Sequence, residues 1–278
     1  MRVPSALVFA WAFVAQFASL AMAHPAVGIV IDASGAVFYS DTAQVWRIAP
    51  DGSRAVVVPN VHTHSLWLDP DGNLYGEHLA GGSVWTHRIW RRSPNGTVAD
   101  VIPTRNGFLD DYRDFSLIRD GRGAMYWFDN KPGGGILRRF GTRPVEKVAT
   151  LNIAESGWMS VLPDGTSILV DHGFLVKVTP DGKVQRLPGQ LASVTERYSL
   201  MSVWADGHQN LYVAVYSDAA VRKITPDGVL TTVAKSPVPW QPTGGLVSRD
   251  EALWILETSP TNQQRVRKIA KDGRVQIF

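Results

Sequence analysis

Residues 215–228 read Val-Tyr-Ser-Asp-Ala-Ala-Val-Arg-Lys-Ile-Thr-Pro-Asp-Gly. An apolar run ends near an acid, a second run alternates apolar and basic residues, and Pro-Asp-Gly closes the unit. Alternation of this kind is typical of a half-exposed β-strand. Asp-Gly supplies the positive φ that tight hairpin turns need. The stretch therefore predicts two short antiparallel strands followed by a tight turn.

The same punctuation recurs along the chain at nearly constant spacing. The glycines of this turn series fall at positions 52, 96, 141, 182, 228 and 273. A second series of turns lies between them, at residues 33–35, 70–72, 121–123, 163–165, 205–207 and 249–250. Each unit of about 42 residues has two tight turns and room for four short strands, which is typical of β-propeller blades.

Six such units account for residues 24–278, which we interpret as a single domain. We predict an all-β fold, a six-bladed β-propeller of four-stranded antiparallel blades. The predicted first strands are Gly28–Ile31, Ser65–Leu68, Phe115–Ile118, Trp158–Leu162, Leu200–Trp204 and Gly244–Val247. Because the units leave no spare strand, we expect the ring to close by packing of blade 1 against blade 6, or by a shifted strand register.

The first 23 residues do not fit the repeat. They contain one Arg, then an apolar run, and end in Ala-Met-Ala. That is the layout of a secretory signal peptide with a small-residue cleavage site. We therefore expect cleavage after Ala23 and a secreted or periplasmic protein.

Composition excludes several classes of partner and site. Lys and Arg total 28 and Asp and Glu total 25, with no basic run, which argues against nucleic-acid binding. The absence of Cys excludes disulfides and thiolate metal sites. After the signal, no stretch approaches the roughly 18 apolar residues of a membrane span. A small-molecule ligand is the expected partner, and a protein partner is the alternative.

Two stretches carry a recognisable family pattern. Residues 66–75 read Leu-Trp-Leu-Asp-Pro-Asp-Gly-Asn-Leu-Tyr, and residues 215–228 continue the pattern into apolar–basic alternation and Pro-Asp-Gly. The sequence resembles the NHL and SMP-30/gluconolactonase-like superfamily of six-bladed propellers. The resemblance covers residues 24–278 and implies that the first strand of each blade lines a central channel. It implies little about activity, because such propellers include hydrolases, lyases, receptors and scaffolds.

This resemblance also sorts the loops onto two faces. Loops that enter first strands share one face with loops that join second to third strands, and five of the seven histidines map there. His62 and His64 are two residues apart, so in an extended segment both point the same way, about 6.6 Å apart. Two imidazoles placed in this way can bind one Zn²⁺ or another transition metal. Ca²⁺ is the expected ion if the site is built from carboxylates instead.

We therefore predict a site at this His-rich mouth of the channel. The predicted metal ligands are His62, His64, Glu77, His78 and His172, with Asp114 as a further candidate. A metal-bound water would be a nucleophile near neutral pH. The predicted catalytic residues are Asp111 and Asp114 as general bases, Arg113 and Arg197 as anion-binding groups, and Tyr198.

Family comparisons imply two versions of the site. Lactonases of the superfamily bind a divalent metal through a Glu of the first inner strand with Asn and Asp from other blades. Residues 24–28 contain no Glu. The Asn and Asp ligands of such a site would be supplied by Asn130, Asp171 and Asp218. The peptidyl-amidating lyase, a propeller of similar kind, combines a His-bound zinc with Arg and Tyr, and the His cluster with Arg197 and Tyr198 resembles that set.

Simpler interpretations stay open beside these. A His-x-His segment occurs on strand edges without metal, and His172 after Asp171 is typical of a turn cap. An acid follows the second strand in nearly every blade, and because it recurs so regularly we interpret it as structural: Asp41, Asp129, Asp171, Asp218 and Glu257. The leading function is a metal-dependent hydrolase, lactonase- or esterase-like, or a lyase. The alternative is a non-catalytic propeller that binds a ligand or partner protein in the cell envelope, through aromatics such as Tyr112, Tyr198 and Trp240.

Overall fold

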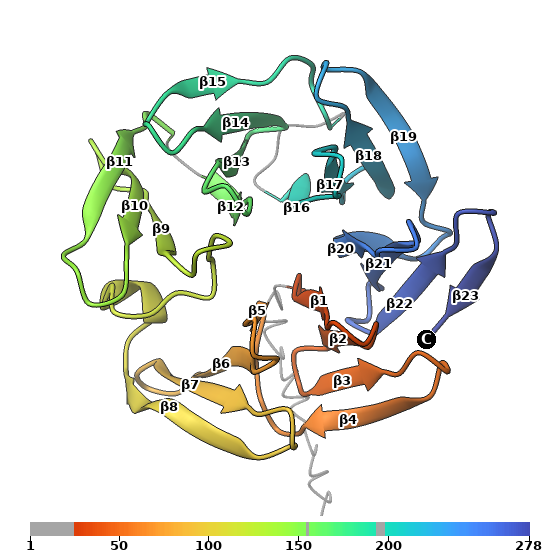
Figure 1. Cartoon of the computed structure of the whole chain (residues 1–278), viewed down its shortest axis with the longest axis horizontal. Helices are drawn as coiled ribbons and strands as arrows, with labels where there is room; N and C mark the ends of the chain where they lie inside the picture. The colour runs from red at the N-terminus through yellow and green to blue at the C-terminus, as the bar shows by residue number, and fades with distance from the viewer. Residues whose placement is uncertain (1–24, 154–155, 193–197) are drawn as a thin grey trace, which may run out of the picture.

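A computed structural model describes residues 25–153, 156–192 and 198–278. Its strands form six antiparallel sheets arranged as blades around a central axis (Figure 1). The predicted signal, residues 1–23, and the predicted anion-binding Arg197 lie outside the described residues. The all-β fold and the six blades are confirmed, with one difference in blade 3.

Within each blade the strands follow one another in chain order from the centre to the rim. Blade 1 holds β1 (Ile29–Ile31), β2 (Val37–Ser40), β3 (Val45–Ile48) and β4 (Arg54–Val58). Blade 2 holds β5 (Leu66–Leu68), β6 (Leu74–Ala80), β7 (Thr86–Arg92) and β8 (Val98–Asn106). Blade 3 holds β9 (Met125–Asp129), β10 (Gly135–Arg139) and β11 (Glu146–Thr150).

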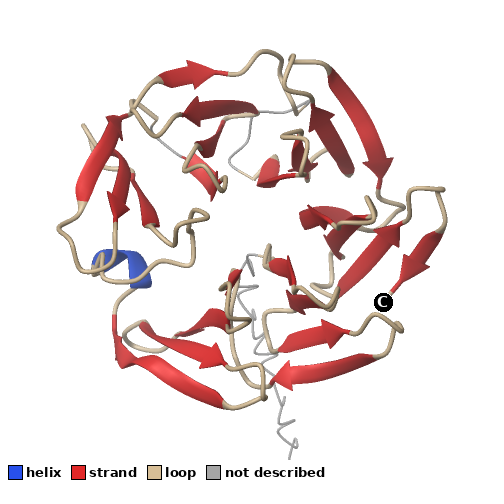
Figure 2. Cartoon of the chain, viewed as in Figure 1, coloured by secondary structure: helices blue, strands red, loops and turns tan. Residues whose placement is uncertain are grey.

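The other three blades are four-stranded. Blade 4 holds β12 (Ser156–Val161), β13 (Ser167–Asp171), β14 (Phe174–Val178) and β15 (Val184–Arg186). Blade 5 holds β16 (Leu200–Ala205), β17 (Leu211–Val215), β18 (Ala220–Ile224) and β19 (Leu230–Lys235). Blade 6 holds β20 (Gln241–Val247), β21 (Leu253–Thr258), β22 (Gln264–Ile269) and β23 (Val275–Ile277). Between blades 2 and 3 lies one 3₁₀ turn, η1 (Leu109–Asp111), shown in blue in Figure 2.

The prediction of an inner strand at Phe115–Ile118 is wrong, because the described part of blade 3 has three strands and an isolated bridge between Arg119 and Met125. Side chains take the place of the ladder. The Ser116 hydroxyl donates to the Tyr126 carbonyl at 2.7 Å. The Trp127 indole donates to the Phe115 carbonyl at 3.2 Å. Side-chain bonds of this kind compete with regular strand pairing.

The turns of the repeat follow the prediction, with one shift. Gly52 and Gly228 have φ values of 85° and 89°, as their hairpins require. In blade 5 the positive φ, 63°, falls on Gln209 and not on the predicted Gly207. Asp206 stabilises this wider turn by accepting the backbone N–H groups of His208 and Asn210.

The hydrophobic core lies between adjacent blades. Phe38 of blade 1 packs with Leu66, Leu74 and Trp90 of blade 2, and Trp90 is fully buried. The same kind of contact closes the ring, because Ile29 of blade 1 belongs to one cluster with Trp254 and Val266 of blade 6. Closure by packing of blade 1 against blade 6 is therefore confirmed. No helix in the described part of the chain has the length and apolar character of a membrane span.

Candidate functional site

A cavity of about 850 Å³ opens on the face to which the histidines were assigned. Blades 2 to 5 line it, from the segment before β5 to the entrance of β16. Five predicted site residues meet there: His64, Glu77, Asp111, Arg113 and Tyr198. The fold thus brings together residues that are up to 134 positions apart in the sequence, on the face to which their loops are predicted to belong.

The segment that carries His64 is held from both sides. The His64 carbonyl accepts the N–H groups of Val27 and Gly28 at 2.9 and 2.8 Å. The Ser40 hydroxyl donates to the carbonyl of the buried Thr63 at 2.6 Å. These bonds tie the loop before β5 to blade 1, so His64 enters the cavity from a fixed backbone.

The two imidazoles of this segment lie close together. The ring centroids of His62 and His64 are 4.7 Å apart and the ring planes are nearly perpendicular. His64 Nδ1 lies 4.0 Å from Glu77 Oε1, within ion-pair range but too far for a hydrogen bond. Burial lowers the pKa of His62, and the charge of His64 lowers it further, whereas Glu77 opposes the shift. His62 is therefore a neutral ring at pH 7.

His78 has a different role from its neighbour Glu77. Successive strand residues face opposite sides of a sheet, so His78 turns away from the face that Glu77 presents. Its Nδ1 accepts the backbone N–H of His62 at 2.9 Å. Burial lowers the pKa of His78, and the positive charge of Arg88 adds to that effect. The ring is thus a neutral hydrogen-bond acceptor that supports the His62–His64 segment.

The loop around η1 contains two predicted bases, and both are engaged. Asp111 Oδ2 accepts the Phe108 N–H at 2.9 Å. Asp114 forms a bidentate pair with Arg105, at 2.6 and 2.7 Å, and this contact lowers the pKa of Asp114. Arg105 also donates through Nε to Nε2 of the fully buried His87 at 2.9 Å. Asp114 therefore holds the loop in place and is a weaker base than a free aspartate.

The sequence predicts no catalytic role for Asp110. Its environment nevertheless suits a proton donor better than the environments of Asp111 and Asp114 do. It lines the same cavity as His64 and Glu77 and is exposed to it. The surrounding protein reduces its hydration and raises its pKa, Arg113 opposes the shift, and the charges of Glu77 and Asp111 add to it. No sequence signal separates Asp110 from Asp111, because the shift depends on neighbours from β6 and from the far side of the loop.

Arg113 stands at the same wall of the cavity. Its backbone adopts a left-handed φ of 54°, and its carbonyl accepts a hydrogen bond from Arg139. The Nη1 atom of Arg113 is buried without a hydrogen-bond partner among the described residues. Because Arg113 also lines the cavity, its guanidinium is suited to bind a substrate oxygen.

His172 and the recurring acids serve the scaffold. His172 Nδ1 lies 2.9 Å from Asp171 Oδ1, at a turn outside the cavity, as the turn-cap interpretation requires. Asp41 accepts the Trp46 indole N–H at 2.7 Å. Asp218 pairs with Arg222, and the fully buried Glu257 pairs with two arginines of β22. Asp41, Asp171, Asp218 and Glu257 thus make the scaffold contacts that the structural interpretation requires, whereas Asp129 accepts the Lys131 N–H at 3.3 Å and also lines the cavity.

A metal ion does not fit the side chains as they stand. Within residues 25–153, 156–192 and 198–278, no three His, Asp or Glu side chains are placed to hold one ion. His62, His64 and Glu77 approach one another, but Nδ1 of His78 is already bonded and His172 lies elsewhere. The predicted metal site stays a prediction.

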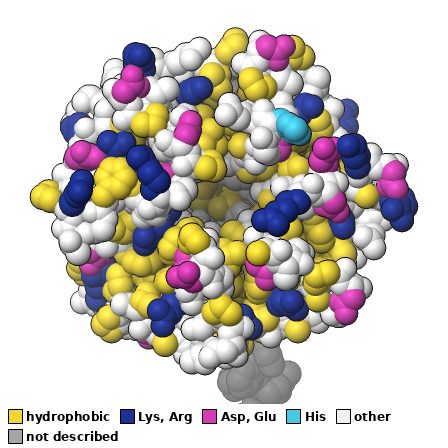
Figure 3. Space-filling model, viewed as in Figure 1, with side chains coloured by type: hydrophobic (Ala, Val, Ile, Leu, Met, Phe, Trp, Pro, Cys, Tyr) yellow, Lys and Arg dark blue, Asp and Glu magenta, His cyan; other side chains and the backbone are white. Residues whose placement is uncertain are grey.

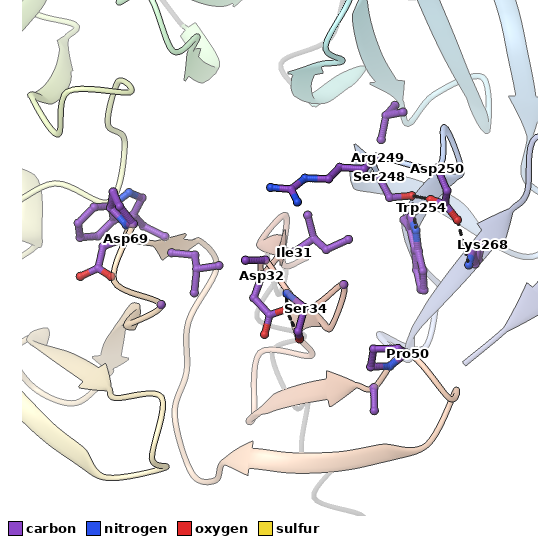
Figure 4. A pocket seen from close by; sticks show the side chains of 18 of the residues that line it. Ile31, Asp32, Ser34, Pro50, Asp69, Ser248, Arg249, Asp250, Trp254 and Lys268 are labelled. Carbon is purple, nitrogen blue, oxygen red and sulfur yellow. Dashed lines mark hydrogen bonds and ion pairs between the residues drawn. The ribbon is translucent and has the colours of Figure 1, made fainter.

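A second cavity, of about 1120 Å³, opens on the face of the tight turns (Figure 4). Its acids are engaged in the turns themselves. Asp32 accepts the N–H groups of Ser34 and Ala36, and Asp250 lies within reach of Ser248 and Lys268. Arg249 extends toward the channel. Despite its larger volume, this cavity is lined by acids that the turns already engage, so the loop-face cavity is the better candidate. The space-filling view shows a hollow at the centre of the ring (Figure 3).

Comparison with known proteins places the fold. No protein-family model matches the sequence, and no curated protein matches it either. A gluconolactonase from Xanthomonas campestris superposes with a TM-score of 0.57 at 14% identity, over 86% of this chain and 85% of that one. This chain is a six-bladed propeller of the gluconolactonase fold.

Two further propellers show the range of activities on this fold. The calcium-binding protein regucalcin from Agrobacterium tumefaciens gives a TM-score of 0.55 at 17% identity, over 84% of this chain and 81% of that one. A catalytically inactive histidine-to-alanine variant of virginiamycin B lyase from Staphylococcus aureus, bound to quinupristin, gives 0.55 at 13% identity, over 91% and 83%. At these identities the likeness establishes the propeller, which the repeat predicted, and leaves the reaction to the site.

Proposed function

We propose that this protein is an enzyme that cleaves a small molecule, as a hydrolase of the lactonase or esterase type or as a lyase, in the loop-face cavity. The observation that carries the proposal is the convergence of His64, Glu77 and Asp110 in one cavity of about 850 Å³. Cavities of this size hold drug-sized molecules. Titratable groups held in different environments in one cavity are typical of acid–base catalysis.

The roles follow from the environments. Glu77 lies 4.0 Å from His64 Nδ1, so its charge stabilises the imidazolium that forms when His64 acts as the general base. Asp110, with its raised pKa, keeps a proton to higher pH than an ordinary aspartate and is the proton donor to the leaving group. Arg113, which lines the same cavity, is the group that binds the oxygen on which negative charge develops. In a hydrolase the base activates water, and in a lyase it removes a proton from the substrate.

The comparisons support this proposal without deciding the reaction. Loss of one histidine inactivates the S. aureus lyase, and the other two propellers are described as a gluconolactonase and a calcium-binding protein. The alternative role of His62, His64 and Glu77 is to hold a divalent ion, in which case His64 is a ligand and not the base. Elemental analysis decides between the two roles. Export to the periplasm or the medium, directed by residues 1–23, is part of it as well.

The rival function is a ligand-binding propeller without catalysis. It is favoured by the fact that Asp111, Asp114 and His78 all make scaffold contacts. Under that function the cavity binds a small molecule and releases it unchanged. Substitution of His64 then changes the affinity for that small molecule, and the unsubstituted protein shows no turnover.

The test is a panel of neutral lactones and esters, assayed with the protein produced with its own leader and purified without chelator. We expect turnover that falls by about 100-fold or more in His64→Gln, since general acid–base groups contribute this much. His208→Gln is the matched control, because His208 is exposed at a turn outside the cavity. Turnover that His64→Gln leaves unchanged contradicts the assignment. Elemental analysis of both variants shows whether an ion depends on His64.

A further inference from the structure

Three large aromatic side chains in the described part of the chain are strongly exposed. They are Trp85, Phe108 and Tyr112, with 47, 47 and 44% of their surface open to solvent. The other strongly exposed apolar side chains there are Val, Leu and Ile. All three aromatics lie at the junction of blade 2 and η1, beside the loop-face cavity. Exposed aromatic surface concentrated at one place marks an interaction site.

The extension of blade 2 creates this surface. Strands β6 and β7 have seven residues each and β8 has nine, whereas the middle strands of the other blades have four to six. The hairpin loop 81–85 ends at Trp85, whose carbonyl accepts the Gly107 N–H at 2.8 Å. That bond joins the hairpin to the loop that carries Phe108 and Asp110. The extra residues therefore build a wall next to the proposed catalytic groups.

Two of the three rings are available to a ligand. The Trp85 and Phe108 rings are 5.8 Å apart and inclined by 32°. Phe108 also lines the cavity, together with Leu79 and Leu109. Tyr112 has another role, because the Arg105 guanidinium covers its ring at 3.7 Å and its hydroxyl donates to the Asn106 carbonyl. Trp85 and Phe108 form what we call the aromatic wall.

The charges around the cavity disfavour an anionic ligand. Four carboxyl groups line it, from Glu77, Asp110, Asp111 and Asp129. Two cations oppose them, Arg113 and Lys131. This excess of acid repels an anionic molecule, and the aromatic wall favours a flat apolar group. The cavity volume matches a small molecule better than a protein surface.

We propose that the aromatic wall binds the aryl group of a neutral, ring-bearing substrate whose reacting bond faces His64, Glu77 and Asp110. The proposal rests on the proposed function, since it names the substrate class for that site. It makes Trp85 and Phe108 specificity-determining residues: they select for the ring and take no part in proton transfer.

Binding of an uncleaved probe tests the wall separately from catalysis. The probe is N-methyl-2-naphthamide, with 2-naphthoate as its anionic counterpart and N-methylcyclohexanecarboxamide as its aliphatic one, each titrated by calorimetry and ligand-observed NMR. Trp85→Leu combined with Phe108→Leu keeps apolar surface but removes both rings. Val238→Ala is the control, since Val238 is 96% exposed and belongs to the loop after β19.

We expect the double variant to bind the naphthamide about tenfold more weakly, because stacking on two rings is lost together with contact area. The aliphatic amide and 2-naphthoate should bind more weakly than the naphthamide to the unsubstituted protein. The single variant Trp85→Tyr, which keeps an aromatic ring at both positions, should retain most of the affinity for the naphthamide. Naphthamide binding that the double variant leaves within twofold, or no binding at all, overturns the proposal. Wall-dependent binding without turnover of any aryl ester retains the wall and rejects the catalytic function.

Discussion

The backbone N–H of His62 donates to Nδ1 of His78 at 2.9 Å, and this bond links β6 to the segment that enters β5. The same segment is also tied to β6 by the bond from the Leu79 N–H to the His62 carbonyl. One histidine thus holds the backbone that positions two others. Since β6 also carries Glu77, the bond fixes the 4.0 Å separation between His64 and Glu77.

Replacing His78 should therefore weaken both the fold and the site. His78→Phe keeps a ring but leaves the His62 N–H without an acceptor, which costs about 1 to 3 kcal/mol for a buried donor. We expect a lower denaturation midpoint and a lower kcat. His78→Asn supplies an acceptor oxygen and should recover much of both. If the two variants unfold at the same urea concentration, the hydrogen bond is not what His78 contributes.

The buried carboxylate of blade 6 offers a prediction about stability alone. Glu257 is fully buried and accepts from Ser236 at 2.7 Å and from Arg265 and Arg267 at 2.7 and 2.8 Å. Glu257→Gln removes the charge that balances two guanidinium groups, and breaking a buried pair costs about 3 to 5 kcal/mol. We expect the loss in urea unfolding, with naphthamide binding unchanged in the fraction that stays folded. A loss below 1 kcal/mol would show that solvent reaches the arginines.

The repeat sufficed to predict the six blades because its signals are local. Asp-Gly turns and apolar–basic alternation act over a few residues, and six copies reinforce one another. Blade 3 departs where local chemistry competes: the Ser116 hydroxyl and the Trp127 indole bond to carbonyls that a regular inner strand would use. A propensity argument that counts apolar residues in 115–118 does not detect this competition.

The sequence predicted on which face of the propeller the candidate site residues lie, but not the contacts that each of them makes. Sorting loops correctly placed His64, Glu77 and Arg113 at one cavity. The environments of Asp110, Asp114 and His78 depend on partners such as Glu77, Arg105 and the His62 N–H, which are distant in sequence or lie on another strand. The aromatic wall was missed for the same reason. Trp85 and Phe108 are 23 residues apart in the sequence and meet only because blade 2 is extended.

Ring closure gives a prediction about a single methyl group. A Cβ on Gly244 of β20 would lie 2.3 Å from the Val27 carbonyl oxygen, which belongs to the backbone before β1. Because backbone cannot rotate away, Gly244→Ala should destabilise the ring by about 3 kcal/mol. Gly207→Ala is the control, since a Cβ there meets nothing within 4 Å and should change stability by less than about 1 kcal/mol. Equal thermal midpoints for the two variants would refute closure through this contact.

Tyr212 provides a spectroscopic prediction at high pH. Burial raises its pKa to about 12, and its hydrogen bond to Asp206 and the charge of that group add to the shift. The neutral form is favoured in the folded state, so this stabilisation is complete below the unfolded pKa of about 10 and is lost as pH rises toward 12. The pKa values of Tyr39, Tyr75, Tyr126 and Tyr216 are raised as well, so titration of phenolate absorbance should show several late tyrosines. Tyr212→Phe should remove one phenolate equivalent at the high-pH end. At pH 8 this variant should lose about 2 kcal/mol, the typical worth of a hydrogen bond to a charged acceptor, and the difference should shrink as pH approaches 12.

Asp110 links stability to the proposed chemistry. Its folded pKa lies above the unfolded one, so ionisation costs stability as pH rises through the unfolded value, and the full cost is present above the folded value. Asp110→Asn removes that cost. We expect the variant to unfold at a higher temperature than the unsubstituted protein at pH 8, with the gain fading as pH falls below 4. Turnover of the neutral ester or lactone should fall by about 100-fold, as for loss of a general acid.

The control for that result is Asp111→Asn, one residue away. Asp111 Oδ2 accepts the Phe108 N–H, so its amide variant should be no more stable than the unsubstituted protein at any pH. If Asp110→Asn and Asp111→Asn shift the melting temperature equally, the effect is a general relief of negative charge around η1. If only Asp110→Asn is both more stable and less active, the fold is holding that carboxyl in a poorly hydrated place at a cost to stability. Lower stability in return for activity is typical of residues in an active site.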